Sequence, residues 1–192
     1  MENMSDYCQT CKFAERPFDL ARGVLLYSGD AARLVKAFKS GDKYYAPYFA
    51  DMMFDYYTEN LVTHNINAAC FVPCGKKRLK ERGYNQSAEL ARLFCEKAKL
   101  PLFDCLAHTR PVGKQSLLTG AERAENVKGA FQIKDGFPGS DDCPGAEIKD
   151  KRMMLIDDVF TTGSTTGECS RVLKKAGAEA VYVFTLATGK GH

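Results

Sequence analysis

Apolar residues recur along the chain with two kinds of spacing. In the first third they recur every three or four positions, which predicts two helices with one buried face each, over 30–39 and 46–61. An earlier stretch, 18–28, is expected to be extended, either as a strand pair or as one strand with a bend at Gly23. From residue 66 onward, short apolar runs alternate with helical patterns. The chain is therefore expected to change there from a helical to an α/β arrangement.

This second part is predicted to contain a parallel sheet flanked by helices. Its expected strands are 68–72, 102–107, 131–133, 153–157 and 180–187, and its expected helices are 87–98 and 165–176. Continuous apolar strands with helices between them are typical of parallel sheets in α/β domains. We therefore expect a small N-terminal hood region at 1–61 and an α/β domain at 62–192. Residues 134–150, which are acidic and contain Gly and Pro, are expected to form a surface loop.

Composition indicates an ordinary globular protein. The chain is 45% hydrophobic and 27% charged, with a formal net charge of +3, which disfavours tight DNA binding by the domain alone. The sequence has no run of 18 apolar residues and no secretory signal pattern, so we expect no membrane span and a cytoplasmic protein. Thiols stay reduced in that compartment, and four cysteines in apolar patterns are expected to be buried, namely Cys70, Cys95, Cys105 and Cys169.

The strongest chemical signal lies in residues 153–173. Four apolar residues run into Asp157 and Asp158, and the small-residue loop TTGSTTG then leads into a predicted helix. Unpaired N–H groups and the helix dipole attract a phosphate, while carboxylates at a strand end can accept hydrogen bonds from a diol. Gly163 lets the backbone approach the ligand, and hydroxyls add donors from Thr161, Thr162, Ser164 and Thr165. A plain strand-to-helix turn would explain the hydroxyls but not the two acids, so the pattern predicts a site for a ribose 5-phosphate.

The stretch LIDDVFTTGST resembles the phosphoribosyl pyrophosphate (PRPP) signature of type I phosphoribosyltransferases. The resemblance implies that Asp157 and Asp158 are the catalytic acids and bind the ribose hydroxyls, and that 161–165 anchor the phosphate. It also implies that Mg²⁺ binds together with PRPP. Displacement of pyrophosphate through an oxocarbenium-like state needs positioned charge and no protein nucleophile.

A basic cluster follows the first predicted strand of the α/β part. Five cations fall within the seven residues 76–82, beside a turn that contains glycine. Such a turn can clamp a pyrophosphate, although a solvated charged face would have the same composition. We interpret this turn as the pyrophosphate loop, formed by Cys74, Gly75, Lys76, Lys77 and Arg78.

Two further segments resemble the competence protein F (ComF) family. RLKERGYNQSAELA matches its R-x-x-RG-[FY]-NQ-x-x-x-LA element, and residues 110–131 match its next element. The polar segment 110–128 lies between two predicted strands, where a mobile lid could shield C1 of PRPP from water, and a surface loop with a short helix is equally compatible. The lid candidates are Arg110, Lys114, Gln115, Arg123 and Asn126.

The N-terminus departs from the family pattern, which includes a multi-cysteine zinc ribbon. Only Cys8 and Cys11 precede Cys70, so two thiolates are present where a structural zinc site needs four ligands. We interpret this CxxC as a possible zinc half-site left in a truncated ribbon. Zinc within one chain is not expected, whereas a metal shared by two chains would make the protein a homodimer.

The resemblance implies a phosphoribosyltransferase that uses PRPP and an acceptor that the sequence does not identify, a nucleobase or an amine. Two alternatives stay open. One is a PRPP- or nucleotide-binding regulator without turnover, and the other is a competence component that acts with the DNA-uptake machinery.

Overall fold

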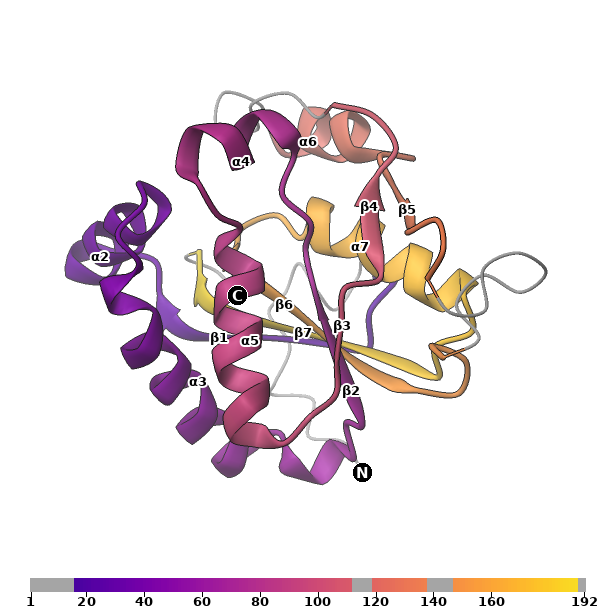
Figure 1. Cartoon of the computed structure of the whole chain (residues 1–192), viewed down its shortest axis with the longest axis horizontal. Coiled ribbons are helices and arrows are strands. Elements are labelled where there is room, and N and C mark those ends of the chain that lie inside the picture. Colours follow the sequence, from indigo (N-terminus) through magenta and orange to yellow (C-terminus); the bar gives the residue numbers. More distant parts are fainter. Residues whose placement is uncertain (1–15, 112–118, 138–146, 190–192) are drawn as a thin grey trace.

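The computed structural model describes residues 16–111, 119–137 and 147–189. Its centre is a five-stranded parallel sheet in the order β1-β7-β6-β2-β3 (Figure 1). The strands are β1 (Leu20–Leu26), β2 (Ala68–Phe71), β3 (Leu102–Phe103), β6 (Arg152–Phe160) and β7 (Ala180–Thr188). The predicted α/β class, a parallel sheet flanked by helices, is confirmed.

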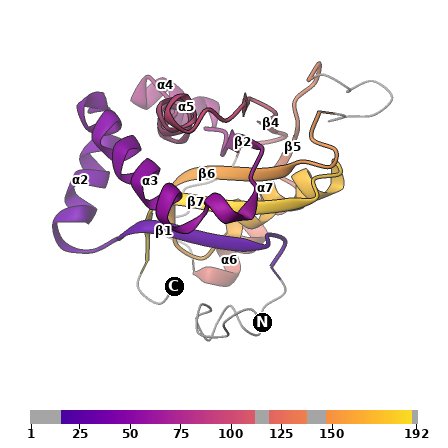
Figure 2. The same cartoon turned by 90° about the horizontal axis from the view of Figure 1, so that it is seen from below.

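Helices cover both faces of this sheet (Figure 2). One face carries α2 (Gly29–Lys39), α3 (Ala46–Asn60) and α5 (Gln86–Ala98), and the other carries α7 (Ser164–Lys175). Successive strand residues point to opposite faces, so Met154 and Ile156 join the core under α3 and α5, whereas Met153 and Leu155 join the core under α7. This two-sided burial explains why the strands read as continuous apolar runs.

The region predicted as a hood shares both the sheet and a core with the rest of the chain in its described part. The stretch 18–28 forms the single strand β1, which pairs in parallel with β7. Gly23 lies inside this strand, where a side-chain Cβ would come within 2.8 Å of Thr188 Cβ. Helix α3 is joined to its neighbours by the short 3₁₀ helices Lys43–Tyr45 and Val62–His64, and its Tyr57 ring packs edge-on against Phe94 at 5.4 Å.

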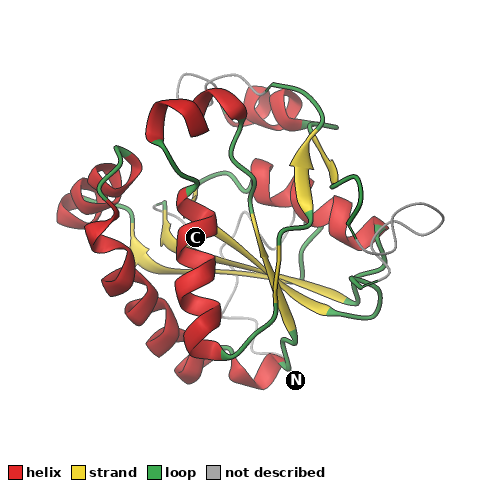
Figure 3. Cartoon of the chain, viewed as in Figure 1, coloured by secondary structure: helices red, strands yellow, loops and turns green. Residues whose placement is uncertain are grey.

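The segment predicted as one strand over 102–107 is divided, so that prediction is wrong. β3 extends the main sheet, whereas β4 (Leu106–His108) pairs antiparallel with β5 (Phe131–Ile133) in a separate two-stranded sheet (Figure 3). Helix α6 (Gly120–Val127) lies in the connection between β4 and β5 and begins with a capping box between Thr119 and Glu122. The expected loop at 134–150 lies largely outside the described residues.

Two further boundaries differ from the prediction near the candidate site. β6 continues past residue 157 because Val159 and Phe160 still pair with β7, so both acids lie within the strand. The predicted pyrophosphate loop, residues 74–78, runs into helix α4 (Lys76–Arg82), which was not predicted. Its Lys, Arg, Leu and Glu residues favour helix, and Gly83 ends it in the left-handed region at φ 78°. The prediction missed this helix because it buries no apolar residue that would produce a periodic pattern.

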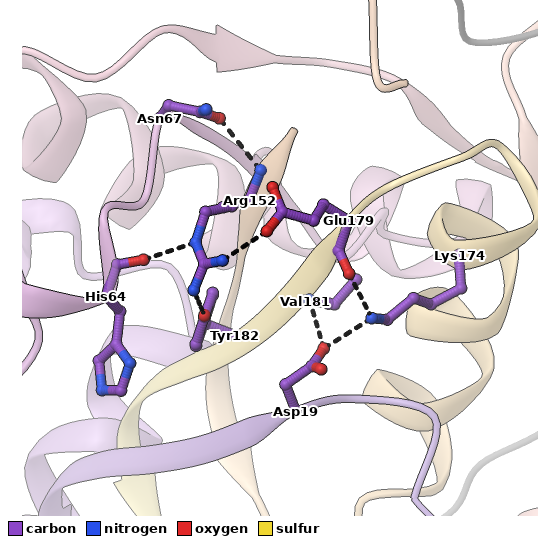
Figure 4. Close-up of polar contacts among 8 residues, drawn as sticks. All are labelled: Asp19, His64, Asn67, Arg152, Lys174, Glu179, Val181 and Tyr182. Carbon is purple, nitrogen blue, oxygen red and sulfur yellow. Dashed lines mark hydrogen bonds and ion pairs between the residues drawn. The ribbon is translucent and has the colours of Figure 1, made fainter. Parts of the chain in front are cut away.

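Polar contacts join the amino ends of the strands (Figure 4). Arg152 donates from Nε to the His64 carbonyl at 2.7 Å and from Nη1 to Glu179 at 2.6 Å, and it also contacts the Tyr182 hydroxyl. Asp19 accepts from the Val181 amide and from Lys174 Nζ, each at 2.8 Å. In open parallel sheets ligands bind beyond the carboxyl ends of the strands, so we expect the ligand at the end opposite to these contacts. Among the described helices, none is long and apolar enough to cross a membrane.

Candidate functional site

Asp157 and Asp158, here called the carboxylate pair, lie near the carboxyl end of the central strand β6. Asp157 Oδ1 accepts from the Ser87 hydroxyl at 2.8 Å and from the backbone N–H of Asp158 at 2.9 Å. Asp158 Oδ1 lies 3.0 Å from Lys39 Nζ, at the end of helix α2. The pair is therefore held by side chains from two other segments of the chain, α5 and α2.

Burial has a large effect on the ionisation of this pair. Burial and the neighbouring Asp158 charge together raise the pKa of Asp157 to about 7, while the Ser87 hydrogen bond and Lys39 act in the opposite direction. Asp157 is therefore harder to ionise at neutral pH than an ordinary carboxyl. Hydroxyl groups or a cation that reach the site would favour its fully ionised form.

The phosphate turn, residues 161–165, follows the carboxylate pair and leads into α7. Gly163 has φ 74°, and a Cβ there would come within 2.8 Å of the Phe160 ring, so glycine is needed on both counts. The hydroxyls of Thr162 and Ser164 lie 2.8 Å apart, and the Gly167 amide donates to the Gly163 carbonyl at 2.7 Å. The predicted order of strand, acids, small-residue turn and helix N-terminus is thus present, with the helix beginning at Ser164.

Arg16 contacts this turn and was missed from the sequence. Its Nη1 donates to the Thr162 carbonyl at 2.9 Å and lies 3.1 Å from the position that a Cβ of Gly163 would take. Its Nε is buried with no hydrogen-bond partner in the structure as described. The two residues are 146 positions apart, and a single arginine ahead of the first strand gives no local signal of such a contact.

The basic segment lies on the same side of the molecule as the carboxylates. Gly75 precedes helix α4, which carries Lys76, Lys77 and Arg78 in its first turn. Burial raises the pKa of the Cys74 thiol; Arg82 and Arg78 lower it, and the two carboxylates raise it. Cys74 therefore lies within electrostatic reach of both the cations and the acids, which brings these two predicted parts of the site together.

His108 supports this turn from β4. Its Nε2 lies 3.1 Å from the Pro73 carbonyl, and its ring is 4.6 Å from that of Phe131 on β5. Burial lowers the pKa of His108, so the ring is neutral at pH 7 and must carry its proton on Nε2 to donate to this carbonyl. The predicted pyrophosphate turn is thus connected to the two-stranded sheet.

The two ends of the predicted lid, 110–128, lie a few residues from the strands of that sheet. Arg110 donates to the carbonyls of Asn126 and Lys128 at 3.1 and 3.0 Å, and the Gly129 amide donates to Glu168 of α7 at 2.9 Å. Arg123 lies on α6. Four other predicted residues lie outside the described part of the chain, namely Lys114 and Gln115 of the lid and Cys8 and Cys11 of the zinc half-site.

The described residues contain no group of three or more His, Cys, Asp or Glu side chains that could hold a metal ion. The carboxylate pair supplies hard oxygen donors, which suit Mg²⁺, but it supplies only two residues. Because Mg²⁺ commonly takes its remaining ligands from substrate phosphates and water, this donor set fits a metal that arrives with a phosphorylated substrate.

No model of a known protein family matches the chain. It is 27% identical to competence protein F of Haemophilus influenzae over 195 residues, covering 97% of this chain and 80% of that protein. It is 31% identical over 120 residues to the DNA utilization protein YhgH of Escherichia coli K12, covering 60% of this chain and 46% of YhgH, so it spans less than half of that relative. These relatives confirm the predicted resemblance to competence protein F.

A solved structure with a similar arrangement is glutamine phosphoribosylpyrophosphate (PRPP) amidotransferase from B. subtilis in complex with ADP and GMP. The match covers 77% of this chain and 26% of that chain, with a TM-score of 0.46 and 20% sequence identity.

Proposed function

We propose that the protein binds PRPP and transfers its phosphoribosyl group to a nucleobase or amine, with release of pyrophosphate. One observation carries this proposal: the carboxylate pair leads directly into the Gly163 turn and the N-terminus of α7, with a basic turn within electrostatic reach. A ligand with a phosphate, a diol and a diphosphate matches these three parts.

Each part of the ligand has a matching part of the site. The phosphate turn would hold the 5-phosphate through backbone N–H groups and hydroxyls at the start of α7. The carboxylate pair would accept hydrogen bonds from the ribose hydroxyls. The diphosphate would lie at the turn before α4, where Lys76, Lys77 and Arg78 follow Gly75.

These positions also account for the proposed chemistry. Positive charge develops at C1 as the diphosphate leaves, and carboxylates close to the ribose favour that charge. The cations of α4 would stabilise the negative charge on the leaving diphosphate. Bound Mg²⁺, held by the carboxylate pair and the substrate, would neutralise further charge on that group. Segment 110–128 would exclude water from C1.

Calorimetry tests the binding step directly. PRPP should bind in the presence of Mg²⁺, and the double variant Asp157→Asn, Asp158→Asn should weaken binding by at least about tenfold, as expected for lost charge-assisted hydrogen bonds. Its thermal unfolding should remain cooperative, which verifies that it is folded. A screen of nucleobases and amines for pyrophosphate release would then identify the acceptor. Unchanged PRPP affinity in the double variant would refute the role of the carboxylate pair. PRPP binding without pyrophosphate release in the presence of any tested acceptor would favour a regulator without turnover.

The names of the relatives support a second role, in the uptake or use of DNA. We propose that PRPP binding serves such a role where the source organism takes up DNA. A strain that carries the Asp157→Asn, Asp158→Asn variant should then lose transformation as completely as a deletion strain does. Normal transformation by this strain, with the protein present at its usual level, would separate the competence role from the PRPP site.

A further inference from the structure

The RGYNQ element, residues 82–86, makes contacts that lead to the carboxylate pair. The Tyr84 hydroxyl donates to the carbonyl of Phe38, and Gln86 Nε2 donates to the carbonyl of Lys39 at 3.3 Å. The Gln86 amide oxygen accepts from Arg82 at 3.0 Å, which fixes the orientation of the amide. The last carbonyls of a helix lack partners within the helix, so these side chains hold the end of α2 by satisfying them.

Through Ser87 and the end of α2, this segment is connected to both carboxylates. Ser87, the next residue, donates directly to Asp157. The clamped end of α2 presents Lys39 to Asp158, with Nζ 3.0 Å from Oδ1, and the two side chains are only 28% and 13% exposed. In such a partly buried place, an ammonium and a carboxylate attract each other more strongly than at a fully exposed surface.

We propose that Lys39 is an internal cation that occupies Asp158 in the ligand-free protein and competes there with the divalent cation that accompanies PRPP. This inference rests on the proposed function. The ammonium contacts Oδ1 of Asp158, and a divalent ion on either oxygen of that carboxylate would lie close to the ammonium and repel it, so metal binding favours departure of Lys39. The end of α2 is held through backbone carbonyls, so the Lys39 side chain can leave while the helix stays in place.

This competition makes metal binding depend on PRPP. A free divalent ion gains only the ligands of two carboxylates when it breaks the contact between Lys39 and Asp158. The same ion bound to a diphosphate also keeps oxygen ligands from the phosphates, while the cost of breaking that contact is the same. Lys39 therefore weakens the binding of the free metal until the substrate arrives.

The test uses Mn²⁺ alone as a paramagnetic probe, titrated into the full chain without PRPP and followed by electron paramagnetic resonance. Lys39→Gln should bind Mn²⁺ at least roughly threefold more tightly than the wild type. A change of this size is expected when a competing, partly exposed ion pair is removed. Lys36→Gln provides a matched control, because this exposed lysine lies one turn earlier in α2. It should leave Mn²⁺ affinity unchanged.

A second variant tests the clamp without touching the charge. Tyr84→Phe removes the hydroxyl that holds Phe38 but keeps the ring, so Lys39 is held less firmly and Mn²⁺ affinity should rise by a smaller factor than in Lys39→Gln. Denaturant midpoints of all variants verify that they are folded. Equal or weaker Mn²⁺ binding by folded Lys39→Gln would overturn the inference. Failure of the wild type to bind PRPP with Mg²⁺ would instead contradict the proposed function.

Discussion

The raised pKa of Asp157 predicts that this residue lowers the stability of the free protein at neutral pH. Asp157 has a pKa of about 7 in the folded chain, compared with an ordinary value of 3.8. An acid whose pKa is raised on folding favours the folded state most below its unfolded pKa, and this contribution is lost as the pH rises through the folded pKa. The free energy of unfolding should therefore fall between about pH 4 and pH 7 because of this one group.

The magnitude follows from the shift. Three pKa units correspond to about 4 kcal/mol, which is an upper bound because Asp157 keeps some solvent contact. Asparagine is neutral and nearly the same shape, and its Oδ1 can still accept from Ser87 and from the Asp158 amide. Asp157→Asn should thus raise the free energy of unfolding at pH 8 by about 1–3 kcal/mol, and this gain should shrink toward pH 4.5.

Urea denaturation of the wild type and Asp157→Asn at several pH values between 4.5 and 8 measures this difference. The control is Asp55→Asn, at an exposed position on α3, which should change the free energy of unfolding by less than about 0.5 kcal/mol throughout. The reasoning is refuted if Asp157→Asn destabilises the protein by the same amount at pH 5 and pH 8. That result would mean that the folded site favours the charged form of Asp157.

Four other outcomes are expected. A triple variant that reverses the charges of Lys76, Lys77 and Arg78 should lose PRPP binding, whereas its affinity for ribose 5-phosphate should fall only slightly. Calorimetry measures both affinities, and equal losses would indicate a general electrostatic effect. Arg16→Met should weaken the binding of ribose 5-phosphate several-fold, because the Thr162 carbonyl loses its hydrogen bond, and Arg16→Lys should keep part of the affinity. An unchanged affinity in Arg16→Met would show that Arg16 does not contribute to the site. Arg152→Ala should lower the free energy of unfolding by about 1–3 kcal/mol in urea and leave PRPP affinity unchanged, because its contacts lie at the opposite end of the sheet. The purified monomer should contain well under one zinc per chain and keep its melting temperature in chelator, and stoichiometric zinc that is lost together with folding in Cys8→Ser would contradict this.

The fold was predictable where the local pattern and the final environment agree. β6, α7 and β7 are consecutive, and their apolar runs and helical spacing follow from two-sided burial. Prediction failed where the environment depends on distant residues. Nothing in residues 18–28 indicates that they pair with β7, more than 150 positions later, and the charged sequence of α4 has no apolar face that would show a helical period.

The candidate site divides in the same way. The carboxylate pair and the phosphate turn are contiguous, so their chemistry can be read directly from one stretch of sequence. Arg16, Lys39 and Ser87 reach that stretch only through the fold, and each is an ordinary residue in its own segment. The RGYNQ element could be recognised by resemblance, but its contacts with α2 could not. Ser87 and Lys39 both lower the pKa of Asp157 against the larger effects of burial and the Asp158 charge, so residues with no signal in their own segments still adjust the charge of the site.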